Sequence, residues 1–544
     1  MTCALAAISL ATACLGLDDE VRARIATAIA AEAPALTIGG DESLELSPEV
    51  RAFYEARDGD PLWTNRRGLN RRGRAALATL RGAGDEGLNP ERYAVTTLVA
   101  LADSGQGRND AADADRLRDL ELLLTSRYLL HLEDLAVGAV EPRTAALDSL
   151  WHRRQLEAIA QGDDPVELAA SLLPITPQYA GLRNALARYV AIATDGGWAT
   201  LPEGEGEEVI LALRERLAAE GDEQQRDPPA GDTGGTFDAD LRTALRHFQT
   251  RHSMKETGEL DDATRAALNM PIEERLNALR LSMDRWRSLP REFGDLHIFV
   301  NIPSYELDVV ENGEPILDMR VVVGRDVNPT PAMTDTMEYI VLNPYWNVPE
   351  SIVNEEILPL LREAPEYLAQ QNMEVVDRDG EEPVIIDPES IDWEEEADTF
   401  PYHIRQRPGP GNALGQVKFM FPNAANIYLH DTPADVLFDE THRAFSHGCV
   451  RVEKPMELVN LIVERATELA PASVDSMLAG ETEKHVELDQ AIPVHLAYLT
   501  VWVDDETGIR FLPDLYDKDA GVKELAHARL VPLSASESRR GGGL

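Results

Sequence analysis

The spacing of apolar residues changes near His297 and divides the chain into two structural classes. Before that point, Leu117, Leu120 and Leu124 recur in steps of three and four residues, a spacing that predicts helices with one apolar face. From His297 onward, apolar residues such as Ile298 alternate with other residues, as they do in strands. The sequence therefore predicts a multidomain α+β protein, with helical domains first and a β-rich domain after them.

Breaks in these patterns give the expected domain organisation. A polar stretch rich in Pro and Gly, residues 222–236, interrupts the helical pattern, and a second interruption falls within the β-rich part. The expected boundaries are a leader at 1–17, a weak helix or tether at 18–48, a helical scaffold domain at 49–205, a small three-helix domain at 206–272, a β-rich domain at 290–520 with an insert at about 351–410, and a tail at 521–544.

The charge of the chain excludes some partners. Its 96 acidic residues against 51 lysines and arginines give a formal net charge of −45. A surface this negative repels nucleic-acid phosphates and anionic lipid headgroups, so we expect no nucleic-acid partner. Acidic residues are dense between Asp377 and Asp398, where we expect a solvated loop or lid. A metal site is the second interpretation of this stretch, although the spacing of the acids does not match that of an EF-hand loop.

The cysteines point to export and to a single thiol of interest. Cys3 and Cys14 lie in or beside an apolar, uncharged run at residues 4–16, which suits the core of an export signal although no positive residues precede it. Cys14 follows small residues that fit a cleavage site, and it is a candidate lipid-carrying membrane anchor. We therefore expect a periplasmic or cell-envelope protein. Cys449 stands alone in the rest of the chain and is either a reactive thiol or a buried core residue.

The neighbours of Cys449 favour the reactive thiol. Cysteine attacks as the thiolate, so it needs a nearby imidazole to accept its proton, and both His430 and His447 are candidates. His430 ends an alternating strand pattern, and the loop that follows it is long enough to bring Cys449 back beside it. Ser446-His447-Gly448-Cys449 is a glycine-containing turn whose backbone N–H groups are able to face a developing oxyanion. These residues predict a Cys–His acyltransferase.

The whole pattern, His430 followed after fifteen residues by Ser446-His447-Gly448-Cys449 and then Arg451, resembles the signature of the L,D-transpeptidase (YkuD-like) catalytic domain. The flanking sequences agree with this resemblance over residues 289–517, namely NPYWNVP at 343–349, PGPGNALG at 408–415 and KFMFPN at 418–423. The segments FDADLRTALRHFQ and TGELDDATRAAL resemble a peptidoglycan-binding domain, and the helical region is similar to the scaffold domain of large periplasmic members.

The resemblance implies roles for individual residues. Cys449 would be the acylated nucleophile and His430 its general base. The backbone carbonyl of Asp431, rather than its carboxylate, would orient the base. Other positions would line the site: His447 and Gly448 in the oxyanion turn, Tyr428 and Ser446 beside it, Arg451 either on a substrate carboxylate or in a structural salt bridge, and Trp346 either on substrate or in the core.

The resemblance also implies a reaction. Cys449 would attack a tetrapeptide stem of peptidoglycan, expel the terminal D-Ala, and pass the acyl group to an amine of another stem, which makes a 3–3 cross-link without a metal or organic cofactor. The expected partners are therefore stem peptides and glycan strands. Water as acceptor would make the site an L,D-carboxypeptidase. Two competing hypotheses are a non-catalytic wall-binding scaffold and a metal-dependent hydrolase that uses His430, His447 and Cys449.

Overall fold

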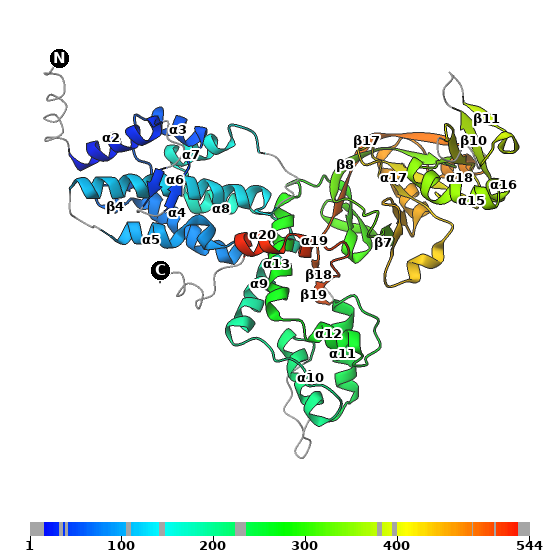
Figure 1. The fold of residues 1–544 in the computed structure, drawn as a ribbon, viewed down its shortest axis with the longest axis horizontal. Coiled ribbons are helices and arrows are strands. Elements are labelled where there is room, and N and C mark those ends of the chain that lie inside the picture. The colour runs from blue at the N-terminus through cyan, green and yellow to red at the C-terminus, as the bar shows by residue number, and fades with distance from the viewer. Residues whose placement is uncertain are drawn as a thin grey trace. The chain divides into compact units, whose positions relative to one another are not determined.

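The computed structural model describes residues 16–31, 36–38, 42–104, 110–140, 147–223, 235–377, 383–393, 400–480, 482–504 and 507–530. Cys3, Cys14 and nearly all of the expected leader lie outside these residues, as do much of the polar stretch at 222–236 and part of the acidic stretch. The chain packs into two compact units, one formed by residues 1–291 with 500–544 and the other by residues 292–499 (Figure 1). The predicted α+β multidomain fold is confirmed.

The first unit is mainly helical and also contains short pairs of strands. A buried 27-residue helix, α6, passes through its core, and the leucines that predicted it are among its buried residues. Its helices are α2 (Leu17–Ala30), α3 (Pro48–Glu55), α4 (Arg71–Arg81), α5 (Val95–Asp103), α6 (Ala111–Val137), α7 (Trp151–Gln161), α8 (Pro165–Ser171), α9 (Pro177–Thr194), α10 (Glu207–Glu220), α11 (Ala239–Arg251), α12 (Asp262–Leu268), α13 (Ile272–Ser288), α19 (Lys518–Gly521) and α20 (Lys523–Leu530), with 3₁₀ turns η2 (Gly82–Glu86) and η3 (Pro90–Tyr93). Its strand pairs are β1 (Leu36–Ile38) with β2 (Glu42–Leu44), β3 (Thr64–Asn65) with β4 (Gly68–Leu69), and β18 (Val501–Asp504) with β19 (Gly508–Phe511).

Helix α2 falls in the segment for which the sequence predicts a weak helix or tether. Val21 and Ile25 are buried in the core that also contains Leu120 of α6. Leu17, Val21, Ile25 and Ile29 recur at four-residue steps along this helix and lie in or against that core, so α2 packs through an apolar face that contacts α6. The segment is therefore a packed helix and not a free tether over the described residues 17–30.

A second, smaller apolar core holds together the three helices α10, α11 and α12. It includes Leu213 and Leu217 from α10, Leu245 and Phe248 from α11, and Leu268 at the end of α12. These helices and this core correspond to the small three-helix domain expected at 206–272.

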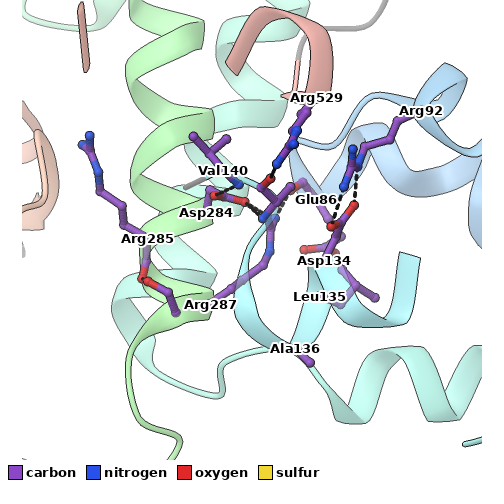
Figure 2. A network of polar contacts seen from close by, with 12 residues as sticks. Glu86, Arg92, Asp134, Leu135, Ala136, Val140, Asp284, Arg285, Arg287 and Arg529 are labelled. Atoms are coloured by element: carbon purple, nitrogen blue, oxygen red, sulfur yellow. Dashed lines mark hydrogen bonds and ion pairs between the residues drawn. The ribbon is translucent and has the colours of Figure 1, made fainter. Parts of the chain in front are cut away.

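Buried charges join α6, α13 and the C-terminal helix α20 (Figure 2). Asp284 on α13 accepts hydrogen bonds from the backbone N–H groups of Ala139 at 2.7 Å and Val140 at 2.9 Å, just beyond α6. Arg287 lies 3.2 Å from Asp284, and Arg529 of α20 donates to the Ala139 carbonyl. Because each of these charges has fixed partners, the network stabilises the crossing of the three helices.

The C-terminal segment beyond Leu499 belongs to the helical unit, although the sequence predicts a β-rich domain that continues to residue 520. Strand β18 pairs with β19, and its Val501 N–H donates to the Ser282 hydroxyl on α13 at 3.0 Å. Leu530 of α20 is buried in the helical core, so the described part of the expected tail, up to residue 530, is packed structure. Sequence periodicity identifies these elements but not the surface on which they pack.

The second unit contains a nine-stranded sheet in the order β15-β7-β16-β14-β13-β8-β17-β5-β6. A further β6–β7 pairing closes the run from β7 to β6 into a ring, and β15 pairs with β7 outside that ring. Helix α17 (Pro455–Ala466) packs against β17 through an apolar side that includes Leu458 and Ile462. The strands are β5 (Leu296–Asn301), β6 (Glu306–Glu311), β7 (Glu314–Gly324), β8 (Met333–Leu342), β13 (Val417–Met420), β14 (Leu429–His430), β15 (Ala444–Ser446), β16 (Val450–Val452) and β17 (Lys484–Ala497), and the shorter elements are η4 (Ile302–Ser304), η8 (Asp435–Asp439) and α18 (Ala472–Leu478).

The insert forms a small folded layer with a core of its own. Leu361, Val375 and Ile404 are among the buried residues of that core. Its four strands run in the order β11-β10-β12-β9, and the segment therefore has regular structure on both sides of the acidic stretch. Its elements are β9 (Trp346–Asn347), α14 (Glu350–Ile352), the π-helical turn η5 (Val353–Ile357), α15 (Leu358–Glu363), α16 (Tyr367–Gln370), β10 (Met373–Asp377), β11 (Val384–Ile386), η6 (Pro388–Ser390) and β12 (His403–Gln406).

Within the described residues, no helix combines the length and the apolar character needed to cross a membrane.

Candidate active site

One face of three neighbouring strands gathers the polar residues around Cys449. Lys418 of β13 is the register partner of His430 of β14, and His430 is the register partner of Arg451 of β16. Residues in register share a face, and side chains two positions apart on a strand point the same way. Tyr428 and Cys449, two residues before His430 and Arg451, therefore join them on this face, which we call the catalytic face. The side chains on the other face, such as Leu429 and Val450, are buried apolar residues.

The Cys449 side chain is partly exposed at the start of β16. Burial of the sulfur raises the pKa of the thiol above its ordinary value, while the backbone and hydroxyl of Tyr428 and the charges of Lys418 and Arg451 act in the opposite direction. The Sγ atom also lies 3.8 Å from the carbonyl oxygen of Asn426. The resting group is therefore a thiol whose neighbours favour the thiolate once a base removes the proton.

His430 is buried, with 5% of its surface exposed. Its Nδ1 atom lies 2.5 Å from the backbone carbonyl oxygen of Asp431. A carbonyl only accepts, so Nδ1 carries the proton and Nε2 is left with a free lone pair. Burial, reinforced by the nearby Arg451 charge, lowers the pKa of His430 to about 3. The ring is therefore a neutral imidazole with Nε2 available as a proton acceptor.

The Asp431 carboxylate binds backbone N–H groups and does not contact His430 as the acid of a catalytic triad would. One oxygen accepts a hydrogen bond from the Gln416 N–H at 2.7 Å, and the other accepts one from the Thr432 N–H at 2.7 Å. The carboxylate thus fixes the loop that leads into β13, where Gly415 has a positive φ of 59° and no room for a side chain beside Asp431. The orienting group for His430 is the main-chain carbonyl.

The turn before Cys449 is held by two hydroxyl groups. Ser446 Oγ donates to the Cys449 carbonyl at 2.5 Å and accepts from the Gly448 N–H at 3.1 Å. Thr330 Oγ1 donates to the Gly448 carbonyl at 2.7 Å and is itself fully buried. The Gly448 N–H, expected from the sequence to face an oxyanion, is therefore engaged by Ser446. In the described structure the N–H groups of His447 and Cys449 have no acceptor, so these two donors remain available at the turn.

His447 contacts the insert rather than the sulfur. Its Nε2 lies 2.6 Å from a carboxylate oxygen of Glu356, in the π-helical turn η5, and 2.6 Å from the guanidinium of Arg325. Arg325 also contacts Glu356 at 3.0 Å. The hydrogen bond from His447 is the main cause of a lowered pKa of Glu356. We call these three residues the insert contact. The sequence pattern does not identify Glu356 and Arg325, because neither lies near the motif in the chain.

The contacts of Arg451 bear on the two roles expected for it, a structural salt bridge and the binding of a substrate carboxylate. Its side chain forms no ion pair with any carboxylate of the described residues, and its buried Nε has no hydrogen-bond partner there. Burial lowers the pKa of the guanidinium, and the Cys449 thiolate is the charge that acts against this. A structural salt bridge is therefore not seen, and the free donors face the side of the sheet that carries Cys449.

The structure adds contacts for Trp346, for which the sequence leaves two roles open, and for Lys418, to which it assigns none. Trp346 is the register partner of Gln406 in the sheet of the insert, and it is partly buried against the core of that layer. Lys418 belongs to a flanking segment to which the sequence assigns no role, yet its Nζ lies 4.1 Å from the centre of the Tyr428 ring. Its place on the catalytic face follows from strand register, which the sequence pattern does not supply.

The described residues contain no group of three His, Cys, Asp or Glu side chains arranged to hold a metal ion. This applies to the described part of the acidic stretch 377–398 as well as to His430, His447 and Cys449.

The second unit thus combines a β-rich fold with a thiol and a buried, neutral imidazole on one face of its sheet, and the first unit is mainly helical. Residues 295–474 match the family model described as "L,D-transpeptidase catalytic domain", residues 48–186 match "Scaffold domain", and residues 206–268 match "Putative peptidoglycan binding domain". Over these three segments the chain is similar to an L,D-transpeptidase catalytic domain, a scaffold domain and a peptidoglycan-binding domain. The resemblance inferred from the sequence is confirmed.

A curated relative and two solved structures are similar to this chain. A protein of Haemophilus influenzae described as "Putative L,D-transpeptidase" is 39% identical over 248 residues, which are 45% of this chain and 48% of that protein. The chain thus spans about half the length of this relative. A solved L,D-transpeptidase from Mycobacterium smegmatis is 13% identical and covers 37% of this chain and 58% of its own, with a TM-score of 0.18. One from Stackebrandtia nassauensis is 14% identical and covers 55% and 97%, with a TM-score of 0.19.

Proposed function

We propose that the protein is a peptidoglycan L,D-transpeptidase in which Cys449 is the nucleophile and His430 the base. The Cys449 sulfur attacks the carbonyl of the third residue of a tetrapeptide stem, and its proton passes to Nε2 of His430. The amide bond to the terminal D-Ala breaks, His430 returns the proton to the leaving amine, and a thioester remains. The side-chain amine of a second stem then attacks the thioester and forms a 3–3 cross-link.

The observation that carries this proposal is the catalytic face. It combines a thiol with a neutral imidazole whose Nδ1 is held by the Asp431 carbonyl, on adjacent strands and beside Arg451. Arg451 would bind a carboxylate of the donor stem with its free guanidinium. Tyr428 and Ser446 would line the site, and backbone N–H groups of the turn would bind the oxyanion.

The accessory domains support a place in the cell envelope. The matched peptidoglycan-binding and scaffold domains would bind glycan strands and stem peptides and bring the catalytic face to the wall. We include in the proposal export to the periplasm or cell envelope, with Cys14 as the candidate anchor.

Purified protein incubated with tetrapeptide muropeptides, followed by mass spectrometry of the products, tests the proposal. Cross-linked dimers with one D-Ala released per link are expected from the native protein and not from a Cys449→Ser variant. Tripeptides without dimers would show that water is the acceptor and would make the protein a carboxypeptidase. No turnover by a protein that binds sacculi equally with and without Cys449 would support the scaffold hypothesis, and loss of turnover in EDTA would support the metal-dependent one.

A further inference from the structure

Lys418 lies on the catalytic face without a counter-ion of its own. Within the described residues no carboxylate oxygen is within 4.0 Å of its ammonium group, and its close contact is the Tyr428 ring, 4.1 Å from Nζ to the ring centre. Glu483 acts on it only at longer range. A half-buried lysine that covers an aromatic ring and has no ion pair is costly to keep unless its charge has a use at this place.

The geometry links Lys418 to the sulfur through Tyr428. Lys418 and His430 are register partners on β13 and β14, and Tyr428, two residues before His430, packs edge-on against the His430 ring with 5.6 Å between ring centres. The Val450 N–H donates to the Tyr428 carbonyl at 3.1 Å, so that Tyr428 lies directly across from the start of β16, where Cys449 is found. The ammonium therefore lies over the residue that flanks both the base and the nucleophile.

We propose that Lys418 is a positioning residue for the acyl-transfer reaction, holding the Tyr428 ring beside Cys449 and supplying the positive charge that stabilises the thiolate during attack. This inference rests on the proposed function, because it assigns Lys418 to the same site. The thiolate forms as the proton moves to His430, and Lys418 changes neither its bonds nor its proton in that step. Its charge lowers the free energy of the ionised sulfur relative to the neutral thiol.

The charges that face Cys449 are consistent with this role. The groups that act on the thiol are Tyr428, just before β14, Lys418 on β13 and Arg451 on β16, and His430 on β14 shares their face of the sheet. Lys418 lowers the pKa of Cys449 against the effect of burial, and Cys449 in turn raises the pKa of Lys418, which burial lowers. The two ionised forms thus stabilise each other, as linkage requires. Arg451 also lowers the pKa of Cys449, but the substrate carboxylate that it is proposed to bind would offset its charge. Lys418 would have no such partner in the substrate, so its charge would remain available to the sulfur.

Alkylation of Cys449 by iodoacetamide tests the inference without any peptidoglycan. A wrong inference about Lys418 is therefore distinguishable from a wrong proposed function. The rate is measured by intact mass from pH 6 to 10 in the full-length protein, with Cys3 and Cys14 replaced by Ser. For Lys418→Met, the midpoint of the profile is expected to move to higher pH and the rate at pH 8 to fall roughly threefold or more. Lys418→Arg is expected to restore the native profile, and Lys484→Met, an exposed lysine on β17, is the matched control.

An unchanged profile in Lys418→Met would overturn the inference. Equal shifts in the Met and Arg variants would also overturn it, because they would show a packing role in which the charge has no part. Where Lys418→Met does not give folded protein, Lys418→Gln is measured in the same way with the same expectation. In stem-peptide acylation, the loss is expected in kcat with KM little changed, because Lys418 contacts Tyr428 and not the substrate.

Discussion

Arg287 and Arg451 are both arginines that lose water by burial, but the pKa of one is raised and that of the other is lowered. Burial works against the charge of Arg287, yet Tyr179 and Asp284 outweigh it, and the guanidinium keeps its proton more firmly than in water. Arg451 has no such partners among the described residues, so burial lowers its pKa. Paired buried charges fix the helical unit, whereas the unpaired charge on the catalytic face is available to a ligand.

The same contrast separates Asp134 from the polar groups of the catalytic face. Asp134 in the helical unit is fully buried, and Arg92 and Tyr93 satisfy both of its oxygens. On the catalytic face, His430 has an acceptor on Nδ1, and the donors of Arg451 have no partner among the residues that the structure describes. The complete set of partners around Asp134 serves stability, and the donors left over on the catalytic face are open to chemistry or binding. Substitutions in each region test this division.

The largest effect is expected from Cys449→Ser. Turnover of tetrapeptide muropeptides should fall by roughly a thousandfold or more, because a serine hydroxyl is far less acidic than a thiol and the site lacks the arrangement to activate it. The product assay by mass spectrometry measures this loss. Unfolding of the helical unit should be unchanged, and near-native rates in this variant would contradict the assigned nucleophile.

Replacement of the two histidines should have unequal effects. His430→Ala removes the proton acceptor and should lower the acylation rate roughly 10²–10⁴-fold, measured by intact mass with a stem peptide. His447→Ala removes a contact with the insert and should cost less, since its backbone N–H remains in the turn. The opposite order would exchange the two roles.

Arg287→Met tests the other side of the comparison. Removal of one partner leaves Asp284 as a buried, incompletely paired charge, and the free energy of unfolding of the helical unit should fall by about 3–5 kcal/mol. Denaturant unfolding followed by hydrogen exchange in α6 and α13 measures this. Arg183→Met is the control, because Arg183 is half exposed in its ion pair with Glu86 and should contribute less than about 1 kcal/mol. Cys449 alkylation should be the same in both variants.

The pH dependence of acylation should reflect the burial of His430. With its pKa lowered to about 3, the imidazole stays neutral as the pH falls from 8 to 5, so the rate should show no inflection at the ordinary histidine pKa. On the alkaline side, burial raises the pKa of Cys449, so direct alkylation should still increase above neutral pH. An acid limb centred near pH 6.5 in the acylation rate would show that the base is solvated.

The smallest effect is expected from Glu356→Gln in the insert contact. The hydrogen bond from His447, helped by Arg325, lowers the pKa of Glu356, so the contribution of this carboxylate is present above its ordinary pKa and is lost as the pH falls through the lowered value. Because all three side chains are partly exposed, the loss should be below about 1 kcal/mol. Hydrogen exchange of α14 and η5 at pH 7 should increase slightly, and no change would show that the apolar packing of the insert is sufficient.

Much of the site follows from the sequence, because its evidence is local. The alternation through Leu429 and the glycine turn at Gly448 predict a strand that ends at His430 and a tight turn before Cys449, as the structure has them. Lys418 and Thr330 do not emerge from the sequence. The place of Lys418 depends on strand register, and that of Thr330 depends on a hydrogen bond to Gly448, which is 118 residues further along the chain. The hydrogen bond from the Gly448 N–H to Ser446 is local, but it depends on the backbone angles of the turn, which the residue types alone do not fix.

The limits on predicting the fold have a similar cause. Periodicity identifies α6 and the change to strands near His297, but not the return of residues 500–530 to the helical unit. That return depends on tertiary contacts, such as the hydrogen bond between Val501 and Ser282, for which neither segment carries a local signal. The insert likewise has an internal apolar core, although its most conspicuous sequence feature is acidity.

The contact between His430 Nδ1 and the Asp431 carbonyl has a consequence for engineering. Where a carboxylate orients a histidine, a single substitution removes the orienting group. The peptide oxygen of residue 431 is kept whatever amino acid replaces Asp431. Transferring this imidazole to another protein would therefore require the same local backbone conformation, but no third side chain. Only a change in that backbone conformation would remove the hydrogen bond that keeps the proton on Nδ1.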